Sequence, residues 1–527
     1  MKTDFLQRCT GTFYTPLPFA ERALEYIERH FTPLPGSAVR LWDAAAGTGH
    51  LEHYLPPDML KHCYLSTLEQ NDVQTLQAKF PGAAAFQYDY LNGKTEQLPV
   101  PLQNDLANRA VQWLILVNPP YATAQDAALG KKTKDSVADT LIRGKMHAEK
   151  LGEVSRELYT QFLYRIKKEF KDKTALLGVF APLKYLVSGN YQKFRDNVFH
   201  CGFRGGFVFS SANFGGTSAA GNFPVSFIVW DINDERRIDS QDIVLDVLDE
   251  NAEKTGVKKL RFADRSQFLN RWIKRPPAVQ VFPPFGSALT VKENNKDVRN
   301  RIADGFLASM MCPGNELQCQ QKTVLLSGPQ ASAGAFSVVP DNFEQAMVVF
   351  AARRVPKDHW LQHVDQFLQP NRELPPEFIT DCAVWTLFDS KNQTVALRNV
   401  KYHNKVYQIE NHLFPFALPE VQRGTSGNIP DNRKESFAAK WLTQRQFSPA
   451  ARNVLEAGKA VYRLYFRERN RLPLEKYRIE TADAGLRQIM LALQDAGQGR
   501  NESAVLKERH EKLRVMILPQ LKDYGIL

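Results

Sequence analysis

The sequence lacks several short motifs that mark common protein functions. It contains no G-x-x-x-x-G-K-[ST] segment, which excludes a P-loop nucleoside triphosphatase. It has no H-E-x-x-H segment and no two cysteines in C-x-x-C spacing. The six cysteines form no regular framework: Cys9, Cys63, Cys201, Cys312, Cys319 and Cys382. We therefore expect reduced thiols and no metal site.

Long apolar runs are missing as well. No run approaches the ~20 apolar residues that a membrane-spanning helix needs. The first ten residues, MKTDFLQRCT, contain no apolar signal core. These features predict a cytoplasmic protein with no membrane partner.

Length and charge point to several domains and a polyanionic partner. A chain of 527 residues is too long for one hydrophobic core, and 43% hydrophobic with 24% charged residues is typical of globular proteins. The net charge is +11, of which residues 421–527 carry +8, from 20 basic and 12 acidic residues. A basic C-terminal region favours binding to nucleic acid, although a solvated helical surface would look the same.

Apolar segments alternate with helical patterns in the first half of the chain. Strands are expected at 38–45, 61–70, 83–91, 112–118 and 174–183, and helices at 20–31 and 157–170. Two strands at 205–211 and 223–232, with no helix between them, predict an antiparallel hairpin. The fold class is therefore α/β, with a mostly parallel sheet. Residues 124–156 form a basic insertion, either a disordered loop or a flap over the substrate.

The rest of the chain has a different pattern. Residues 246–420 read as shorter strands, and residues from 435 onward read as helices, one beginning at Ser448-Pro449. The expected domains are 1–245, a mixed α/β region at 246–420, and a basic helical region at 421–527.

A glycine turn and two acidic residues follow three of the strands. DAAAGTGHL (43–51) leads from a strand towards an expected helix, and Gly47 and Gly49 allow close approach of a ligand to the backbone. Glu52 stands where a pyrophosphate-binding fingerprint has glycine, so NAD and FAD are disfavoured. Glu69 and Asp89 end the next two strands, where carboxylates suit ribose hydroxyls and an adenine amino group.

The fourth strand ends in Asn-Pro-Pro-Tyr at 118–121. With these motifs in this order, residues 1–235 resemble the adenine-N6-specific DNA methyltransferases. GTFYTP (11–16) resembles the N-terminal cofactor motif of that family, and DAAAGTG resembles its D-P-A-C-G-S/T-G motif, with departures at Ala44 and Ala46. NPPY matches the family's catalytic signature completely.

The resemblance implies a Rossmann-like class I methyltransferase domain followed by a target recognition region. Its cofactor would be S-adenosyl-L-methionine and its substrate an adenine flipped out of double-stranded DNA. The implied setting is a restriction-modification or phage-defence system, with a cognate restriction nuclease or other defence subunits as partners. We expect a monomer that associates with the nucleoid through DNA.

The resemblance also implies roles for individual residues. Asn118, through its side-chain oxygen, and the carbonyl of Pro119 would accept hydrogen bonds from the target amine, in a turn stiffened by Pro120. Tyr121, Phe214 and Phe223 would stack on the flipped base. The cofactor-binding residues would be Thr12, Phe13, Tyr14, Pro16, Asp43, Gly47, Gly49, Glu69 and Asp89.

Several alternatives remain open on the sequence. An NPPY methyltransferase can act on RNA or on a glutamine amide of a protein, and a non-catalytic DNA-binding subunit can keep the fold. His50 and His53 with His62 and Cys63 form no recognised metal motif, and the first two are expected on a solvent-facing helix. Asp381, in a strand-like run, and Asp389-Ser390-Lys391 loosely imitate a nuclease core.

Overall fold

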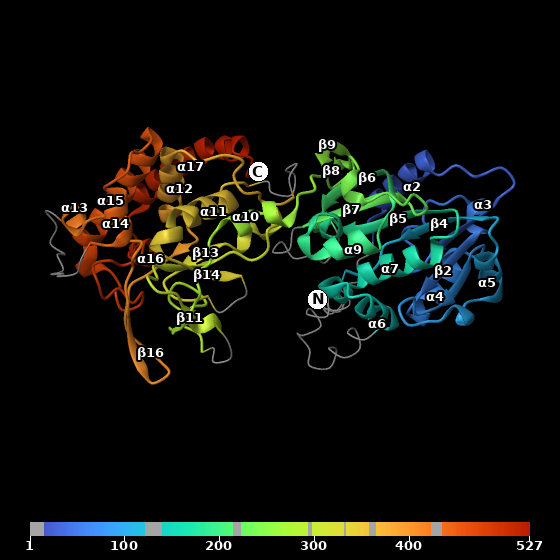
Figure 1. Ribbon diagram of the computed structural model, residues 1–527, viewed down its shortest axis with the longest axis horizontal. Helices are drawn as coiled ribbons and strands as arrows, with labels where there is room; N and C mark the ends of the chain where they lie inside the picture. The colour runs from blue at the N-terminus through green and yellow to red at the C-terminus, as the bar shows by residue number, and fades with distance from the viewer. Residues whose placement is uncertain are drawn as a thin grey trace. The chain divides into compact units, whose positions relative to one another are not determined.

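The chain divides into two compact units. The computed structural model describes residues 15–121, 140–213, 223–293, 298–330, 334–357, 365–422 and 435–527. Unit 1 spans Met1–Phe262 with Trp360–Asp365, and unit 2 spans Ala263–His359 with Gln366–Leu527 (Figure 1). The sequence places its first boundary at 245, whereas the sheet of unit 1 continues beyond that residue. The division into three domains stays a prediction.

Unit 1 is built on one nine-stranded, mostly parallel sheet in the order β3-β2-β1-β4-β5-β7-β6-β8-β9. Its strands are β1 Ala38–Asp43, β2 Cys63–Thr67, β3 Ala84–Gln87, β4 Val111–Val117, β5 Ala175–Pro182, β6 Gly202–Ser210, β7 Pro224–Asp231, β8 Val244–Leu248 and β9 Lys254–Lys259. β1 to β5 are mutually parallel, and β7 lies antiparallel between β5 and β6. The strands and the hairpin expected from the sequence are thus confirmed. The order of strands reverses between β1 and β4, where doubly wound sheets open a crevice for ligands.

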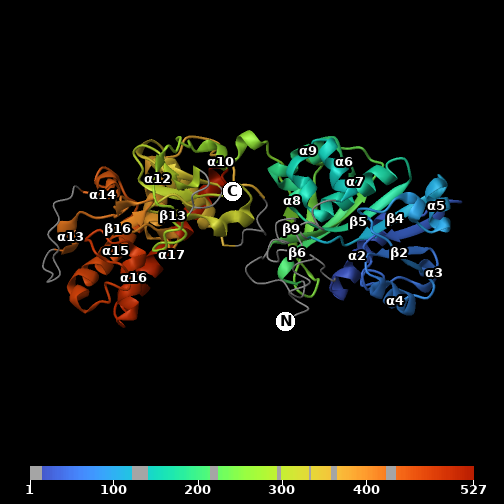
Figure 2. The ribbon, with the colours of Figure 1, turned by 90° about the horizontal axis from the view of Figure 1, so that it is seen from below.

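Helices cover both faces of this sheet, with α6, α7 and α9 on one face and α2 and α4 on the other (Figure 2). The helices are α2 Leu17–His30, α3 Pro57–Leu60, α4 Gln70–Lys79, α5 Val100–Ala107, α6 Leu141–Ala148, α7 Leu158–Phe170, α8 Lys184–Val187 and α9 Gln192–Asn197. On the α7 face, the Phe170 ring lies 6.2 Å from that of Trp42 and 5.4 Å from that of Trp113. On the other face, Phe19 of α2 stacks on Phe209 at 4.1 Å. Buried aromatic rings therefore join the sheet to both helical layers.

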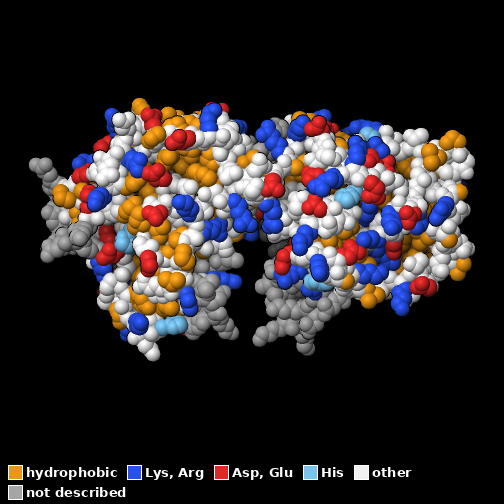
Figure 3. Space-filling view, viewed as in Figure 1, with side chains coloured by type: hydrophobic (Ala, Val, Ile, Leu, Met, Phe, Trp, Pro, Cys, Tyr) orange, Lys and Arg blue, Asp and Glu red, His pale blue; other side chains and the backbone are white. Residues whose placement is uncertain are grey.

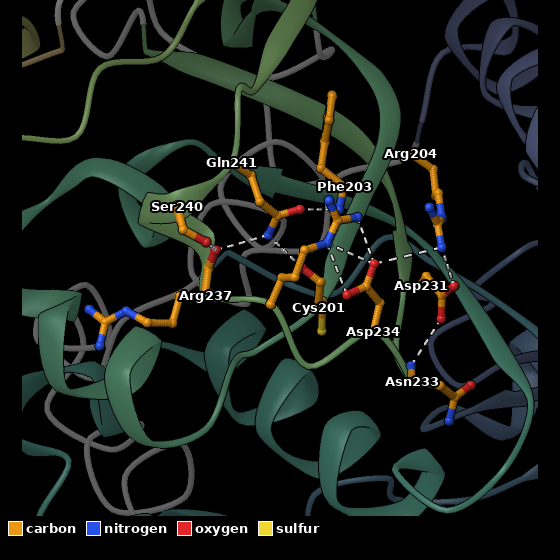
Figure 4. A network of polar contacts seen from close by, with 10 residues as sticks. Cys201, Phe203, Arg204, Asp231, Asn233, Asp234, Arg237, Ser240 and Gln241 are labelled. Carbon is orange, nitrogen blue, oxygen red and sulfur yellow. Dashed lines mark hydrogen bonds and ion pairs between the residues drawn. The ribbon is translucent and has the colours of Figure 1, made fainter.

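A polar network links the end of β7 to the start of β6 (Figure 4). Arg204 forms an ion pair with Asp231 at 2.5 Å, and the Gln241 side chain donates to Cys201 O at 2.8 Å and accepts from Phe203 N at 2.8 Å. Asp231 is paired with the beginning of β5 in the register, so this network lies at the amino-terminal edge of the parallel strands. It fixes the connection from β7 to β8 on the edge opposite the predicted site.

Unit 2 combines a four-stranded sheet, two two-stranded sheets and a set of helices. The sheet has the order β14-β12-β13-β15, and β10 pairs with β11 and β16 with β17. The strands are β10 Gln280–Val281, β11 Arg301–Ile302, β12 Ala308–Met311, β13 Val324–Leu326, β14 Ala335–Val338, β15 Asn392–Gln393, β16 Leu397–Tyr402 and β17 Lys405–Ile409. The helices are α10 Leu269–Trp272, α11 Phe343–Arg354, α12 Pro376–Phe388, α13 Leu418–Gln422, α14 Phe437–Leu442, α15 Pro449–Glu468, α16 Leu486–Asp495 and α17 Arg500–Asp523.

Two local predictions for unit 2 have different outcomes. Ser448 caps α15 by accepting from Ala451 N at 3.1 Å, with Pro449 at the first helical position, as the sequence predicts. The run that contains Asp381 is not a strand but the buried helix α12. An apolar segment that is buried on all sides carries no periodicity that separates helix from strand. The nuclease alternative placed Asp381 on a strand, and the structure places it on a helix instead.

Candidate active site

A cavity of about 320 Å³ opens at the carboxyl ends of β1 to β4. Because parallel strands end on one edge of a sheet, residues from four separate segments meet there. The structure brings six of the predicted site residues to its wall: Asp43, Gly47, Glu69, Asp89, Asn118 and Pro120. The volume lies within the range usual for small-molecule sites.

The loop after β1 forms one wall of this cavity. The Asp43 side chain is fully buried, and its Oδ1 accepts from Ala45 N at 2.7 Å. The backbone φ of Gly47 is +52° and that of Gly49 is +73°, the left-handed region that glycine adopts without strain. A Cβ at Gly49 would lie 2.3 Å from Phe80 Cε2. The second glycine therefore lets the loop pack directly on α4.

The structure corrects the expected continuation of this loop. Residues 47–54 form turns and not a helix, so Glu52 does not stand at a helix N-terminus. Glu52 is fully buried and does not line the cavity. The expected repulsion of a pyrophosphate by Glu52 at a helix start therefore does not apply. His50, expected on a solvent-facing helix, lines the cavity, with Nδ1 2.9 Å from Thr15 O.

Asp43 and Glu52 form a buried pair of carboxyl groups. Burial, and the negative charge of Glu52, raise the pKa of the Asp43 carboxyl well above its ordinary value. Burial also raises the pKa of Glu52, to about 7. Asp43 Oδ2 and both oxygens of Glu52 have no hydrogen-bond donor among the described residues. The pair therefore retains a proton near neutral pH, because two carboxylates without donors are costly to bury.

Acidic residues that follow β2 and β3 continue the wall. Glu69 is exposed and precedes α4 without capping it through its side chain. Asp72, one turn later, has its pKa raised by burial and by the charge of Glu69. Asp89 is held by its own loop, where its Oδ1 accepts from Leu91 N at 2.9 Å.

The charge of the cavity decides which ligands fit it. Four acidic residues and His50, but no lysine or arginine, occur among the described residues that line it. Such a wall repels phosphate groups and attracts a cation.

Asn118 is held by two neighbours at the end of β4. Its Nδ2 donates to Thr15 Oγ1 at 2.8 Å, and its Oδ1 accepts from the Tyr121 hydroxyl at 2.8 Å. Both partners are hydroxyl groups, which can donate as well as accept. β4 is buried along its whole length, so the strand that carries Asn118 is a rigid support.

The other NPPY residues have different surroundings. Pro120 lines the cavity, whereas Pro119 is buried and does not line it. Tyr121 is only 8% exposed, and its ring meets that of Tyr159 edge to face at 6.3 Å. In this position the Tyr121 hydroxyl helps to orient Asn118. The Tyr121 ring would have to become exposed before it could stack on a base.

Helix α7 braces the loop that carries Asp89. Arg165 is 5% exposed, and its guanidinium donates to Tyr90 O, to Gly93 O at 2.9 Å and to the Tyr88 hydroxyl at 2.7 Å. It also pairs with Glu169 at 2.6 Å. A single buried cation therefore joins α7 to the loop that follows β3.

Several lining residues were not predicted from the sequence: Thr15, His50, Asp72, Thr140, Leu158 and Phe162. Thr15 lies inside the GTFYTP segment, four other residues of which were assigned to the cofactor, so its motif was the available signal. Thr140 directly precedes α6, and the residues of this helix belong to the basic insertion expected at 124–156. Leu158 and Phe162 carry no motif, and α7 brings them to the cavity.

The remaining predicted site residues either lie outside the described residues or are not part of the cavity wall. Thr12, Phe13, Tyr14 and Phe214 lie outside the described residues, as do residues 122–139, which hold the first part of the insertion expected at 124–156. The described part of that insertion contains the helix α6. Pro16 lies just before α2. Phe223 N donates to Ser211 Oγ at 3.0 Å; Phe223 precedes β7 at the same sheet edge as the cavity but is not part of its wall.

The described residues show neither a metal site nor a membrane-spanning helix. Among them, no group of three or more His, Cys, Asp or Glu side chains is arranged to hold a metal ion. None of the helices assigned in the described ranges combines the length and apolar character needed to cross a bilayer.

Comparisons with known proteins give structural matches only. No protein-family model matches the sequence, and no curated protein matches it. The chain is similar to a modification subunit of a putative type I restriction enzyme from Vibrio vulnificus YJ016, with 16% identity over 45% of this chain and 47% of that one, at a TM-score of 0.29.

Two further solved structures show the same level of similarity. The methyltransferase subunit of a type I restriction-modification system from Streptococcus thermophilus has 16% identity over 48% of this chain and 50% of its own, at a TM-score of 0.29. The type IIL restriction-modification enzyme MmeI, in complex with DNA, has 10% identity over 94% of this chain and 75% of its own, at a TM-score of 0.31. The chain thus spans about half the length of the two type I subunits.

Proposed function

We propose that the protein is a site-specific DNA methyltransferase that transfers a methyl group from S-adenosyl-L-methionine to the N6 amine of adenine in double-stranded DNA. The observation that carries this proposal is the meeting of Asp43, Glu69, Asp89 and Asn118 on one cavity wall, on a sheet whose strand order reverses at that point. Unit 1 would then be a Rossmann-like class I methyltransferase domain.

The cavity fits this cofactor in charge and in hydrogen-bonding capacity. When bound, S-adenosyl-L-methionine supplies an electrophilic methyl group on a positively charged sulfur. Glu69, exposed after β2, can accept from ribose hydroxyls, and Asp89 from an adenine amino group. Asp43 Oδ2 is fully buried at the wall without a donor among the described residues, which suits the ammonium group of an amino acid. The residues present therefore fit the group.

Asn118 would then orient the target amine. An exocyclic amine conjugated to a purine ring is a poor nucleophile, and accepting its N–H bonds localises the lone pair on nitrogen. The Asn118 amide oxygen can accept two hydrogen bonds, so the bond from Tyr121 is compatible with one from the substrate. The carbonyl of Pro119 is the proposed second acceptor, as the NPPY resemblance implies.

The experiment is transfer of labelled methyl groups to duplex DNA, tRNA, ribosomes or a release factor. Label in N6-methyladenine of duplex DNA is expected, and label that enters only RNA or protein would overturn the proposal. Asn118→Ala should lower turnover at least about 100-fold, the loss typical of one preorganised hydrogen bond at a reacting centre, with cofactor affinity largely retained. Asn104→Ala, on the exposed face of α5, is the matched control and should keep normal turnover.

A further inference from the structure

The hairpin of β16 and β17 projects from the rest of unit 2 (Figure 1). It is a separate two-stranded sheet, and no third strand joins it among the described residues. Lys401 is paired with Val406 and Tyr402 with Lys405, which leaves His403 and Asn404 as a two-residue turn. The φ angles of these two residues are +47° and +58°, the combination of a type I′ turn.

The base of the hairpin is anchored in a hydrophobic cluster. Leu397, Val400 and Ile409 are buried there with Phe285 and neighbouring apolar residues. An isolated two-stranded hairpin is marginally stable in water, so packing of one face is needed to hold it in a defined position. The projecting end is therefore presented on a rigid support.

The other face and the tip are exposed, polar and basic. Residues 397–409 contain Arg398, Lys401 and Lys405 but no acidic residue. Lys401 and Lys405 are exposed and make no ion pair with another described residue. The Val406 side chain, on the face of Lys401, is 58% exposed. Lys, Arg and His side chains lie around the free end of the hairpin in Figure 3.

We propose that this hairpin enters a groove of duplex DNA and reads part of the target sequence. The proposal rests on the proposed function, because it supplies target recognition for that reaction. The major groove admits a two-stranded β-ribbon, and asparagine reads adenine through paired hydrogen bonds. Asn404 and His403 at the tip contact base edges. Lys401 and Lys405 contact phosphates, which strengthens binding but does not depend on the DNA sequence.

Two variants separate these roles without removing the hairpin. His403→Gly with Asn404→Gly removes both tip side chains but keeps the turn, since Gly-Gly is also a favoured type I′ pair. Lys401→Ala with Lys405→Ala removes the two exposed charges. The control for charge is Lys61→Ala with Lys171→Ala, two exposed lysines at the edge of the sheet opposite the cavity. Circular dichroism of each variant should match that of the parent protein.

Binding to duplex DNA is measured over a salt series, and methylated sites are mapped by long-read sequencing of a host that expresses each variant. The lysine variant should weaken binding to all duplexes and reduce the slope of log affinity against log salt by about 1 to 2, whereas the control should not. The tip variant should keep binding to unrelated duplexes and relax the methylated sequence at one or more positions, with discrimination there reduced at least about 5-fold.

The outcomes distinguish failure of this proposal from failure of the proposed function. Parent protein that methylates DNA, with both variants unchanged in salt slope and in methylated sequence, would overturn the role of the hairpin and leave the function standing. Variants that lose methylation but keep the parental affinity for target and unrelated duplexes alike, with the parental salt slope, would show that the hairpin does not contact DNA and would overturn the proposal. Parent protein that neither binds nor methylates duplex DNA would overturn both.

Discussion

Two glycines of unit 1 share a backbone conformation but differ in their surroundings. The φ angle is +73° at Gly49 and +75° at Gly36. A Cβ at Gly49 would lie 2.3 Å from Phe80 Cε2 and 2.9 Å from Leu76 Cδ2, whereas at Gly36 it would meet nothing within 4 Å. Replacing each glycine with alanine therefore separates backbone strain from steric overlap.

The expected costs follow from these distances. The left-handed conformation costs an L-residue roughly 1–2 kcal/mol, which Gly36→Ala and Gly49→Ala share. Overpacking of a buried contact adds roughly 1–3 kcal/mol at Gly49 alone. Gly49→Ala should thus destabilise unit 1 by about 2–5 kcal/mol. It should also weaken cofactor binding, because the displaced helix α4 begins directly after Glu69 and carries Asp72.

Amide hydrogen exchange of peptides from β1 and α4, measured by mass spectrometry, gives the local free energy of opening. This measurement suits a chain of two units, whose global unfolding need not be two-state. Phe80→Leu should offset part of the cost of Gly49→Ala, so that the double variant is less destabilised than the sum of the two single changes. Equal costs for Gly36→Ala and Gly49→Ala would refute the assigned contact between the loop and α4.

Two further predictions concern buried charge in unit 1. Because the folded-state pKa of Glu52 is raised to about 7, the folded protein keeps protons that the unfolded chain loses, so stability falls as the pH rises from about 5 to 7. Glu52→Gln should remove much of this loss, on the order of 3 kcal/mol, in hydrogen exchange of β1, and an unchanged pH profile would contradict the buried pair. Arg165→Met leaves Glu169 without its cation and should cost about 3–5 kcal/mol in the exchange of α7. It should also raise the KM for the cofactor more than it lowers kcat, because the loop that holds Asp89 loses its brace; a drop in kcat alone would show that Arg165 acts elsewhere.

The sequence by itself determined the edge of the sheet on which the site is built. Each of the first four strands has enough apolar residues to be recognised, and Asp43, Glu69, Asp89 and Asn118 follow those strands at or near their ends. Parallel strands end on one edge, so the convergence of these four residues was predictable from chain order. The start of α15 was predictable for a similar reason, since Ser448 and Pro449 act locally.

Tertiary structure alone decided how those residues are held and what surrounds them. Glu52 was expected at a helix start but is buried with Asp43, because the loop packs on α4 instead of continuing as a helix. Thr15 and Tyr121 hold Asn118, and Arg165 braces the loop of Asp89 from more than 70 positions away in the chain. Such contacts depend on side chains that meet only after the sheet and its helices have packed, and no local pattern records them.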